Sequence, residues 1–369
     1  MSPVPAFDLD RAYGEIERDL DVRWRAILES KHFVGGEEVG QFERNFARYL
    51  EVPECVGVAN GTDALILAIR ALGARPGDEV IVPAFTFAAT GATVALVGAE
   101  PVFADVEPAT FNLDPSALEE MVTSRTVGVI GVHLYGTPFA LEAVLEICRA
   151  RGLWLIEDAA QAHGARFAGR RVGSFGDLAT WSFYPSKNLG CFGDGGAVTA
   201  TNPDLLDRVR LLANHGSRER YQHLEIGTNS RLDSFQAAVL NTRLPLLEEK
   251  NARRREIAAA YLDGLADLAA LGCLRLPETV ESVFHQMVVL SPRRDELREF
   301  LSERGIGTAV HYPAPLPEQP CFANAPGNRG RYPEASRAAR EALCLPMFPE
   351  LSNEEVEEVI AALRRFDAT

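Results

Sequence analysis

Three short segments of this 369-residue chain carry side chains that could act together in catalysis. Lys187 lies between an aromatic stretch and a glycine-rich one, Asp158 ends a run of apolar residues, and Asn60 begins the sequence Asn-Gly-Thr-Asp. A lysine amine can form an imine, a carboxylate can keep a pyridine nitrogen protonated, and a Gly-Thr loop can bind phosphate. Together these groups are what a pyridoxal 5′-phosphate (PLP) enzyme needs.

Lys187 is the candidate nucleophile. Its amine must lose a proton before it attacks an aldehyde, so burial or a nearby positive charge must lower its pKa. Once released from the imine, the same amine can move a proton between two carbon atoms as general base and acid. Ser182, five residues earlier, could donate a hydrogen bond to a phosphate. Spacing alone leaves open the alternative that Lys187 is an exposed lysine on a loop.

Asp158 is expected at the carboxyl end of a buried strand, which is where open α/β sheets bind their ligands. From there its carboxylate could pair with the pyridine nitrogen and make the ring an electron sink. Gln161, three residues later, could hydrogen-bond the phenolic oxygen of the ring. The alternative interpretation of Asp158 is a helix N-cap.

The segment from Asn60 to Asp63 is a candidate phosphate loop between an expected strand and an expected helix. The free N–H groups and dipole of a helix N-terminus bind phosphate. Gly61 allows close approach of the backbone, and the Thr62 hydroxyl can also donate. Asn-Gly-Thr is equally consistent with an ordinary turn followed by a helix cap.

Composition and charge exclude several other classes of protein. A net charge of -15 disfavours nucleic-acid binding, and the longest uncharged run, residues 84–99, is too short for a membrane span and predicts a packed internal helix. The six cysteines lack C-x-x-C spacing and the histidines lack H-x-x-x-H spacing, so buried thiols and hydrogen-bonded structural histidines are expected rather than disulfides or a metal site. The chain opens without a basic segment followed by an apolar one, which favours the cytoplasm.

Apolar runs alternate with helix-like segments over residues 55–200. The expected strands are residues 55–59, 79–82, 101–104, 127–132, 153–157 and 197–200. Between them, residues 64–72 and 141–148 repeat apolar positions at helical spacing, each before a glycine. Continuous apolar strands alternating with helices predict an α/β fold with a mostly parallel sheet covered on both faces.

The remainder of the chain predicts a second, smaller domain of α+β type. Residues 232–256 read as a long helix that Pro245 kinks or breaks, so we place the domains at residues 1–245 and 246–369. Beyond it we expect strands at 284–290 and 308–311 and a helix at 294–304 stopped by Gly305. Ser352 with Glu355 predicts a capping box that opens a last helix.

These motifs, taken in order, resemble the DegT/DnrJ/EryC1/StrS sugar aminotransferases, which belong to PLP fold type I, the aspartate aminotransferase fold. The resemblance covers nearly the whole chain and includes residues 59–65, 76–80, 157–161, 181–196, 214–216 and 227–233. It implies a large PLP-binding domain and a smaller C-terminal one. It also implies a homodimer with shared active sites.

The resemblance also implies roles for individual residues. The implied cofactor-binding residues are Gly61, Thr62, Asp63, Phe87, Asp158, Gln161, Ser182, Lys187 and Asn229. Lys187 would hold PLP as an imine, Phe87 would stack on its ring, and Asn229 would reach the phosphate in the neighbouring subunit. Arg231, His311 and Tyr312 would lie near the sugar, also across the dimer. Arg231 has the alternative interpretation of a salt-bridged surface residue.

Some relatives with histidine in place of this lysine are dehydratases, so Lys187 favours transamination. The lysine segment and the His-Tyr-Pro sequence at His311 look most like those of enzymes that aminate C-3 of nucleotide-linked keto-sugars. We therefore expect a dTDP-linked 3-keto-6-deoxyhexose as substrate and L-glutamate as amino donor. The alternatives are C-4 amination, a UDP-linked 3-keto-sugar acid, or a non-catalytic PLP-binding regulator.

Overall fold

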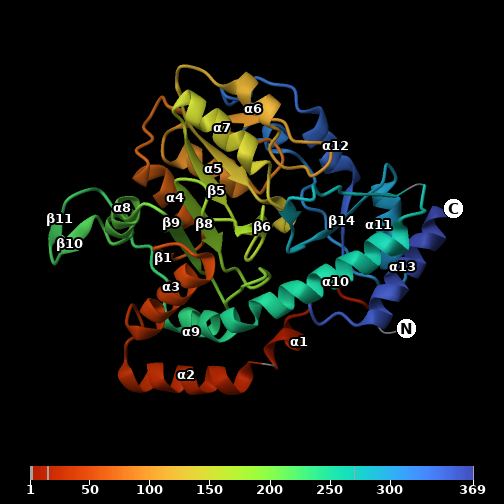
Figure 1. The fold of residues 1–369 in the computed structure, drawn as a ribbon, viewed down its shortest axis with the longest axis horizontal. Coiled ribbons are helices and arrows are strands. Elements are labelled where there is room, and N and C mark those ends of the chain that lie inside the picture. Colours follow the sequence, from red (N-terminus) through yellow and green to blue (C-terminus); the bar gives the residue numbers. More distant parts are fainter. Residues whose placement is uncertain (1–2, 15, 270, 369) are drawn as a thin grey trace.

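The computed structural model describes residues 3–14, 16–269 and 271–368. Within them, a seven-stranded sheet has the order β1-β9-β8-β5-β4-β2-β3 (Figure 1). Strand β9 pairs antiparallel with β1 and β8, and the other neighbours pair parallel, so every strand except β9 runs the same way. The strands are β1 Glu54–Val58, β2 Glu79–Pro83, β3 Glu100–Ala104, β4 Thr126–Val132, β5 Trp154–Asp158, β8 Leu178–Ser182 and β9 Gly196–Ala200. The expected α/β class with a mostly parallel sheet is confirmed.

The six strands expected over residues 55–200 are all present, each within one residue of its predicted ends. Strand β8, which carries Ser182, was not predicted. Its sequence Leu-Ala-Thr-Trp-Ser mixes small and polar residues with apolar ones, and it is buried because both neighbouring strands and helix α4 (Gly61–Ala71) pack on it. Tertiary packing, rather than an apolar run, makes this segment a strand.

Helices cover both faces of the sheet (Figure 1). One apolar core lies under α2, α3, α6, α7 and α9, and a second lies under α4, α5, α8 and α12. The helices of these layers not yet given are α2 Glu17–Ser30, α3 Glu37–Leu50, α5 Ala88–Leu96, α6 Pro115–Met121, α7 Leu141–Arg151, α8 Pro203–Ala213, α9 Ser234–Arg243 and α12 Pro333–Glu341. The segment 84–99 is internal only in part, since α5 buries Val94 but leaves Leu96 69% exposed.

Pro245 interrupts the long helix as expected. Helix α9 gives way to a 3-10 turn, η2 Leu244–Leu246, and α10 Leu247–Leu265 then runs on toward the C-terminal helices (Figure 1). Within α10, Leu247 belongs to the first core, whereas Ile257 and Tyr261 belong to a third core of the C-terminal part. The domain boundary at residues 245 and 246 stays a prediction.

The C-terminal part contains a three-stranded antiparallel sheet of order β12-β14-β15, packed on helices. Its elements are β12 Gly272–Cys273, β14 Met287–Leu290, α11 Arg294–Ser302, β15 Ala342–Leu345 and α13 Asn353–Asp367. The capping box of Ser352 and Glu355 is present. The predicted strand at 308–311 is wrong, because among the described residues only an isolated bridge joins Ala309 to Cys344.

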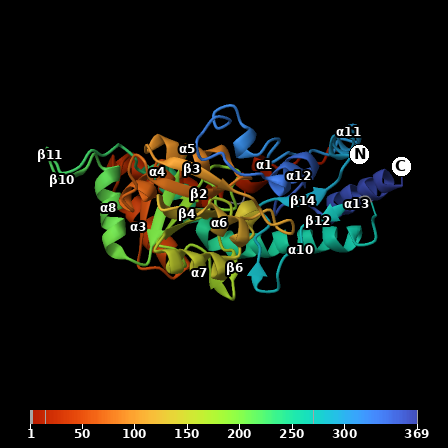
Figure 2. The same cartoon turned by 90° about the horizontal axis from the view of Figure 1, so that it is seen from above.

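Smaller elements complete the chain. They are α1 Leu9–Tyr13, η1 Leu134–Gly136, β6 Arg166–Phe167, β7 Arg170–Arg171, β10 Ser217–Glu219, β11 Gln222–His223, β13 Val280–Glu281 and η3 Leu316–Glu318. The β10–β11 hairpin protrudes from one end of the molecule (Figure 2). Among the described residues, no helix combines the length and the apolar character needed to cross a bilayer.

Glu79, at the start of β2, ties the C-terminal part to the large sheet. Its side chain is fully buried, and Arg329 donates to its two oxygens at 2.9 and 3.0 Å. Thr123 donates to it at 2.6 Å, and Arg125 pairs with it as well. The hydrogen bond from Arg329 is the main reason that the pKa of Glu79 is lowered to about 2, against the opposing effect of burial.

Replacing Glu79 with glutamine (E79Q) is expected to lower the free energy of unfolding at neutral pH by about 2 kcal/mol, because two arginines lose their counter-charge. The pKa of Glu79 is lower in the folded state than in the unfolded state, so its charged carboxylate stabilises the fold at pH values above the unfolded-state pKa. This contribution disappears as the pH falls toward about 2. Calorimetry should therefore show a gap in melting temperature between wild type and E79Q that narrows with acid.

The exposed pair of Glu119 and Arg151 offers a matched control. Its variant E119Q should melt close to wild type at every pH, because exposed ion pairs contribute little. A gap for E79Q that stays constant down to about pH 2 would contradict the assignment.

Candidate active site

The carboxyl ends of β5 and β8 bring Asp158 and Ser182 to one face of the sheet. Asp158 on β5 pairs in register with Thr180 on β8, and Ser182 lies two residues after Thr180 on β8. Because side chains alternate between the two faces of a sheet, all three side chains lie on the same face. Asp158 is buried; it accepts from the Ala160 N–H and from the Thr90 hydroxyl, each at 3.2 Å. Burial raises the pKa of Asp158, and these contacts and Lys187 oppose the rise.

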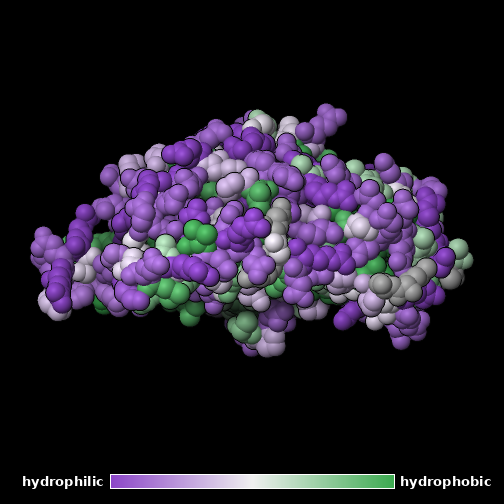
Figure 3. All heavy atoms as spheres, turned by 90° about the horizontal axis from the view of Figure 1, so that it is seen from below, coloured by the Kyte–Doolittle hydropathy of each residue, from purple (hydrophilic) through white to green (hydrophobic). Residues whose placement is uncertain are grey.

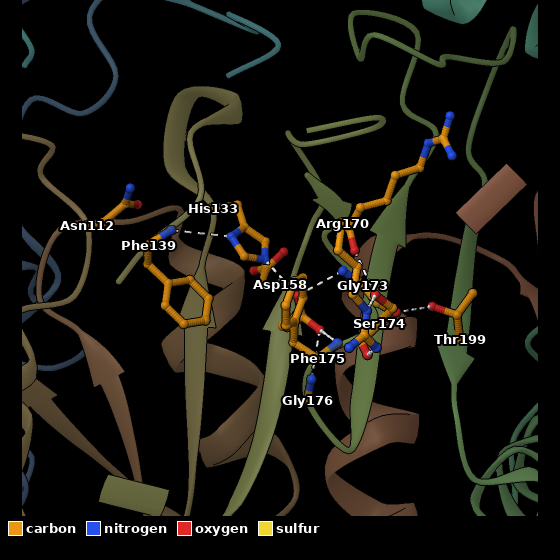
Figure 4. Close-up of polar contacts among 12 residues, drawn as sticks. Asn112, His133, Phe139, Asp158, Arg170, Gly173, Ser174, Phe175, Gly176 and Thr199 are labelled. Atoms are coloured by element: carbon orange, nitrogen blue, oxygen red, sulfur yellow. Dashed lines mark hydrogen bonds and ion pairs between the residues drawn. The ribbon is translucent and has the colours of Figure 1, made fainter. Parts of the chain in front are cut away.

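The neighbouring Glu157 faces the opposite side, because side chains alternate along a strand, and its partners His133, Gly173, Phe175 and Gly176 are labelled in Figure 4. His133 Nε2 lies 3.1 Å from its carboxylate, and the backbone N–H groups of Gly173, Phe175 and Gly176 donate to it at 2.7 to 2.8 Å. Burial alone would raise the pKa of Glu157, but His133 and these N–H groups hold it below its usual value. Glu157 thus fixes the backbone that carries Asp158, and His133 is a hydrogen-bonded structural residue.

Lys187 lies close enough to Asp158 for the two charges to interact. Its side chain is partly exposed along its length, but the amine is in dense surroundings, and burial lowers its pKa to about 8 while Asp158 opposes that shift. The next residue, Asn188, is buried and donates from Nδ2 to Asn251 Oδ1 at 3.0 Å and to the Val283 carbonyl at 3.1 Å. The lysine segment is therefore fixed to α10, and the amine is partly uncharged near neutral pH.

The expected phosphate loop lies against the end of β8. Asn60 caps α4, its side chain accepting from the Asp63 N–H at 2.8 Å, which leaves the N–H groups of Gly61 and Thr62 for a ligand. Gly61 approaches Ser182 so closely that an added Cβ would lie 2.7 Å from the Ser182 Cβ. The loop therefore requires glycine, and two backbone donors and a serine hydroxyl converge at a helix N-terminus.

Gln161 is oriented by its neighbours. Its Oε1 accepts from the backbone N–H of Tyr135 at 2.7 Å, so the amide NH₂ must face the site, where Nε2 lies 3.4 Å from the Tyr312 hydroxyl. This orientation suits a donor to a phenolic oxygen, as expected. Phe87, at the start of α5, is 57% exposed with its ring 5.9 Å from that of Tyr312, so it lies beside the site and not in the core.

His311 and Tyr312 lie beside Gln161 and Lys187 of their own chain, and their expected role across a dimer stays a prediction. Tyr312 contacts Gln161 of its own chain, and Lys187 lies near enough to His311 to help burial lower the pKa of that imidazole. The Cys344 thiol, whose pKa is raised to about 12, lies 3.5 Å from His311 Nδ1. The segment 308–315 turns back toward the sheet, and so both side chains belong to the site of the same chain.

Asn229 and Arg231 are exposed, and the buried Ser230 between them accepts from the Ala59 N–H at 3.1 Å, next to the candidate phosphate loop. Arg231 lines a groove of about 550 Å³ together with Arg210 and Arg218, whereas Lys187 lines a different and much smaller cavity. Asn229 and Arg231 are the residues expected to reach the cofactor and the sugar of a neighbouring subunit. Their roles stay predictions.

Several site residues were not found from the sequence. Thr90 donates to Asp158, and the Tyr135 N–H donates to Gln161. Asn188 fixes the lysine segment to α10. The spacing of Thr90 from Phe87, one helical turn, was a usable signal. The other contacts join segments far apart in the chain, for which the sequence carries no spacing signal.

The described residues fit PLP as a cofactor. Asp158 keeps unused lone pairs for a ring nitrogen, the cradle at Gly61 and Ser182 suits a phosphate, and Lys187 supplies an amine of lowered pKa between them. A PLP-dependent aminotransferase of fold type I is the class of protein that this fold and site define.

The chain belongs to the DegT/DnrJ/EryC1/StrS aminotransferase family, whose model matches residues 15–364. It is 46% identical over 363 residues to dTDP-3-amino-3,4,6-trideoxy-alpha-D-glucose transaminase of Streptomyces venezuelae, covering 98% of this chain and 96% of that one. It is 40% identical to UDP-2-acetamido-2-deoxy-3-oxo-D-glucuronate aminotransferase of Pseudomonas aeruginosa, covering 98% and 99%. The crystal structure of S. venezuelae DesV in complex with ketimine intermediate superposes with a TM-score of 0.97 at 45% identity over 100% of both chains.

The pH dependence of cofactor attachment tests the site. We expect the rate at which PLP attaches to the apoenzyme, followed by absorbance, to rise with pH through about 8 as the Lys187 amine loses its proton. The variant D158N should move this midpoint to lower pH, because the Asp158 charge holds the proton on the amine.

Asp177 provides the control, since it holds the Leu155 N–H near the opposite end of β5. The variant D177N should leave the midpoint unchanged, and K187A should abolish attachment. A midpoint near the ordinary lysine value, or an upward shift in D158N, would show that the assignment is wrong.

Proposed function

We propose that this aminotransferase moves the amino group of L-glutamate to C-3 of a dTDP-linked 3-keto-6-deoxyhexose. The observation that carries the proposal is the pairing of Lys187, with its lowered pKa, and buried Asp158 beside a phosphate cradle. The bound cofactor would supply a ring that stabilises negative charge on the carbon losing a proton.

The residues of the chain divide the remaining work. Asp158 would hold its charge for the ring nitrogen of a bound cofactor, and Gln161, whose Oε1 accepts from Tyr135, would offer its amide NH₂ to the phenolic oxygen. The Lys187 amine takes a proton from one carbon and returns it to another, a role that a pKa of about 8 suits near neutral pH. His311 and Tyr312 border the same site and are placed to contact the sugar.

The relative from S. venezuelae acts, by its name, on a 3-amino sugar linked to dTDP, and this similarity supports C-3 and dTDP. The relative from P. aeruginosa is named for a UDP-linked 3-oxo-glucuronate, which keeps the UDP-linked keto-sugar acid as the alternative. Amination at C-4 is the other alternative. Purified enzyme given each candidate sugar would separate these, because mass spectrometry and NMR of the product show which carbon gains nitrogen.

Mixing the holoenzyme with L-glutamate tests the first half of the reaction. The visible absorbance of the bound cofactor should fall as 2-oxoglutarate forms, and it should return when the keto-sugar is added. A spectrum that glutamate and other amino acids leave unchanged would favour a non-catalytic PLP-binding regulator. Glutamate turnover without any product from the dTDP sugars would instead reject the substrate alone.

We further propose a homodimer with shared active sites, working in the cytoplasm. The protruding β10–β11 hairpin and the segment after it expose Tyr221 (82%) and Ile226 (87%), apolar side chains that a partner would cover. On the face shown in Figure 3, by contrast, hydrophilic side chains predominate and apolar ones form separate patches. The expected lack of a secretory signal rests partly on residues 1 and 2, which lie outside the described residues.

Subunit mixing tests whether Arg231 acts across the dimer. K187A and R231A should each be nearly inactive, but a mixture refolded together should recover about a quarter of the wild-type activity, because half the dimers are mixed and each has one intact site. Recovery is measured as glutamate- and sugar-dependent turnover. No recovery, despite mixed dimers being detected by mass spectrometry, would place Arg231 in its own chain's site.

A further inference from the structure

Tyr135, in η1, adopts a backbone conformation that a bulky residue rarely takes. Its φ of 60° and ψ of 12° lie in the left-handed region, and its side chain is 1% exposed. Asn112 fixes this turn from both sides, accepting from the Leu134 N–H and donating to the Thr137 carbonyl, each at 3.0 Å. Such strain persists only where the surroundings hold it, and it marks functional sites.

The two ends of Tyr135 reach two different parts of the active site. Its backbone N–H donates to Gln161 Oε1 at 2.7 Å, and its hydroxyl donates to the carbonyl of His311. Burial raises the pKa of the Tyr135 hydroxyl, so it remains protonated and a donor. One residue therefore connects the strand-end segment that carries Gln161 with the C-terminal segment that carries His311.

These contacts close into a ring. Gln161 Nε2 lies 3.4 Å from the Tyr312 hydroxyl, and Tyr312 is joined to His311 by a peptide bond. The ring runs from the Tyr135 backbone through Gln161, Tyr312 and His311 and returns to the Tyr135 hydroxyl. Within this ring, two contacts join the C-terminal segment to the rest: the one between Gln161 and Tyr312, and the one from the Tyr135 hydroxyl to His311. Loss of either contact opens the ring.

We infer that Tyr135 is a positioning residue for the sugar half of the reaction. It keeps His311 and Tyr312 in register with Gln161, and hence places the sugar-side residues relative to the cofactor ring. The inference rests on the proposed function only in assigning the sugar to His311 and Tyr312. The left-handed turn is needed because it directs the backbone N–H and the side chain of one residue at two separate partners.

A double-mutant cycle on the holoenzyme tests the ring without any substrate. The variants Y135F and Y312F each remove one hydroxyl, and each opens the same ring, so the double variant should lower the unfolding midpoint by less than the sum of the single shifts. Tyr261 is the matched control: it is a buried tyrosine in the third core whose hydroxyl donates to the Pro346 carbonyl at 3.2 Å. The shifts of Y261F and Y312F should add.

Half-reactions then test the positioning role. In Y135F the fall in absorbance with L-glutamate should proceed within about twofold of wild type, because the backbone N–H still holds Gln161, while KM for the dTDP-3-keto-sugar should rise about tenfold. Y261F should change neither. Additive shifts for Y135F and Y312F, or an unchanged KM, would overturn the inference. Wild-type enzyme that ignores this sugar would instead refute the proposed substrate, and the stability cycle would still decide whether the ring exists.

Discussion

Burial acts in opposite directions on the two ionisable groups at the centre of this molecule, and their mutual attraction opposes both effects. The Lys187 amine loses affinity for its proton, and the Asp158 carboxyl gains it. Without the charge of each other, both groups would move toward the neutral form. The surrounding structure therefore has to keep the two groups buried, close together and oriented, and most of the unusual contacts in the fold serve that requirement.

The contacts that meet this requirement join segments distant in the chain. Thr90 from α5 and the Ala160 N–H fix the Asp158 carboxylate, and Glu157 fixes the strand beneath it. Asn188 ties the lysine segment to α10, whose Asn251 also donates to the His163 carbonyl at 2.7 Å. The lysine segment and the segment that follows Asp158 are thus both hydrogen-bonded to Asn251 of the long helix.

The C-terminal part contributes His311 and Tyr312 to the same site. The segment at residues 308–311 was expected to form a strand, and as a strand it would have been held by a ladder of hydrogen bonds, whereas it makes only an isolated bridge. It is instead attached to the catalytic side through Tyr135 and Gln161. This attachment explains how a segment from the smaller part of the chain lies within a hydrogen bond of the strand-end residues.

The sequence by itself determined the α/β class, six strands of the large sheet and the break at Pro245, and it singled out Lys187, Asp158 and the segment from Asn60 as candidates, because apolar periodicity, proline chemistry and residue type are local properties. It could not find β8, whose Thr and Ser are buried only by neighbouring strands and α4. It also carried no spacing signal that joins His311 and Tyr312 to Gln161. Only the tertiary structure decided that these residues belong to the chain's own site, that Thr90, Tyr135 and Asn188 support it, and that the Lys187 amine is partly uncharged, since burial and hydrogen bonding depend on segments brought together by the fold.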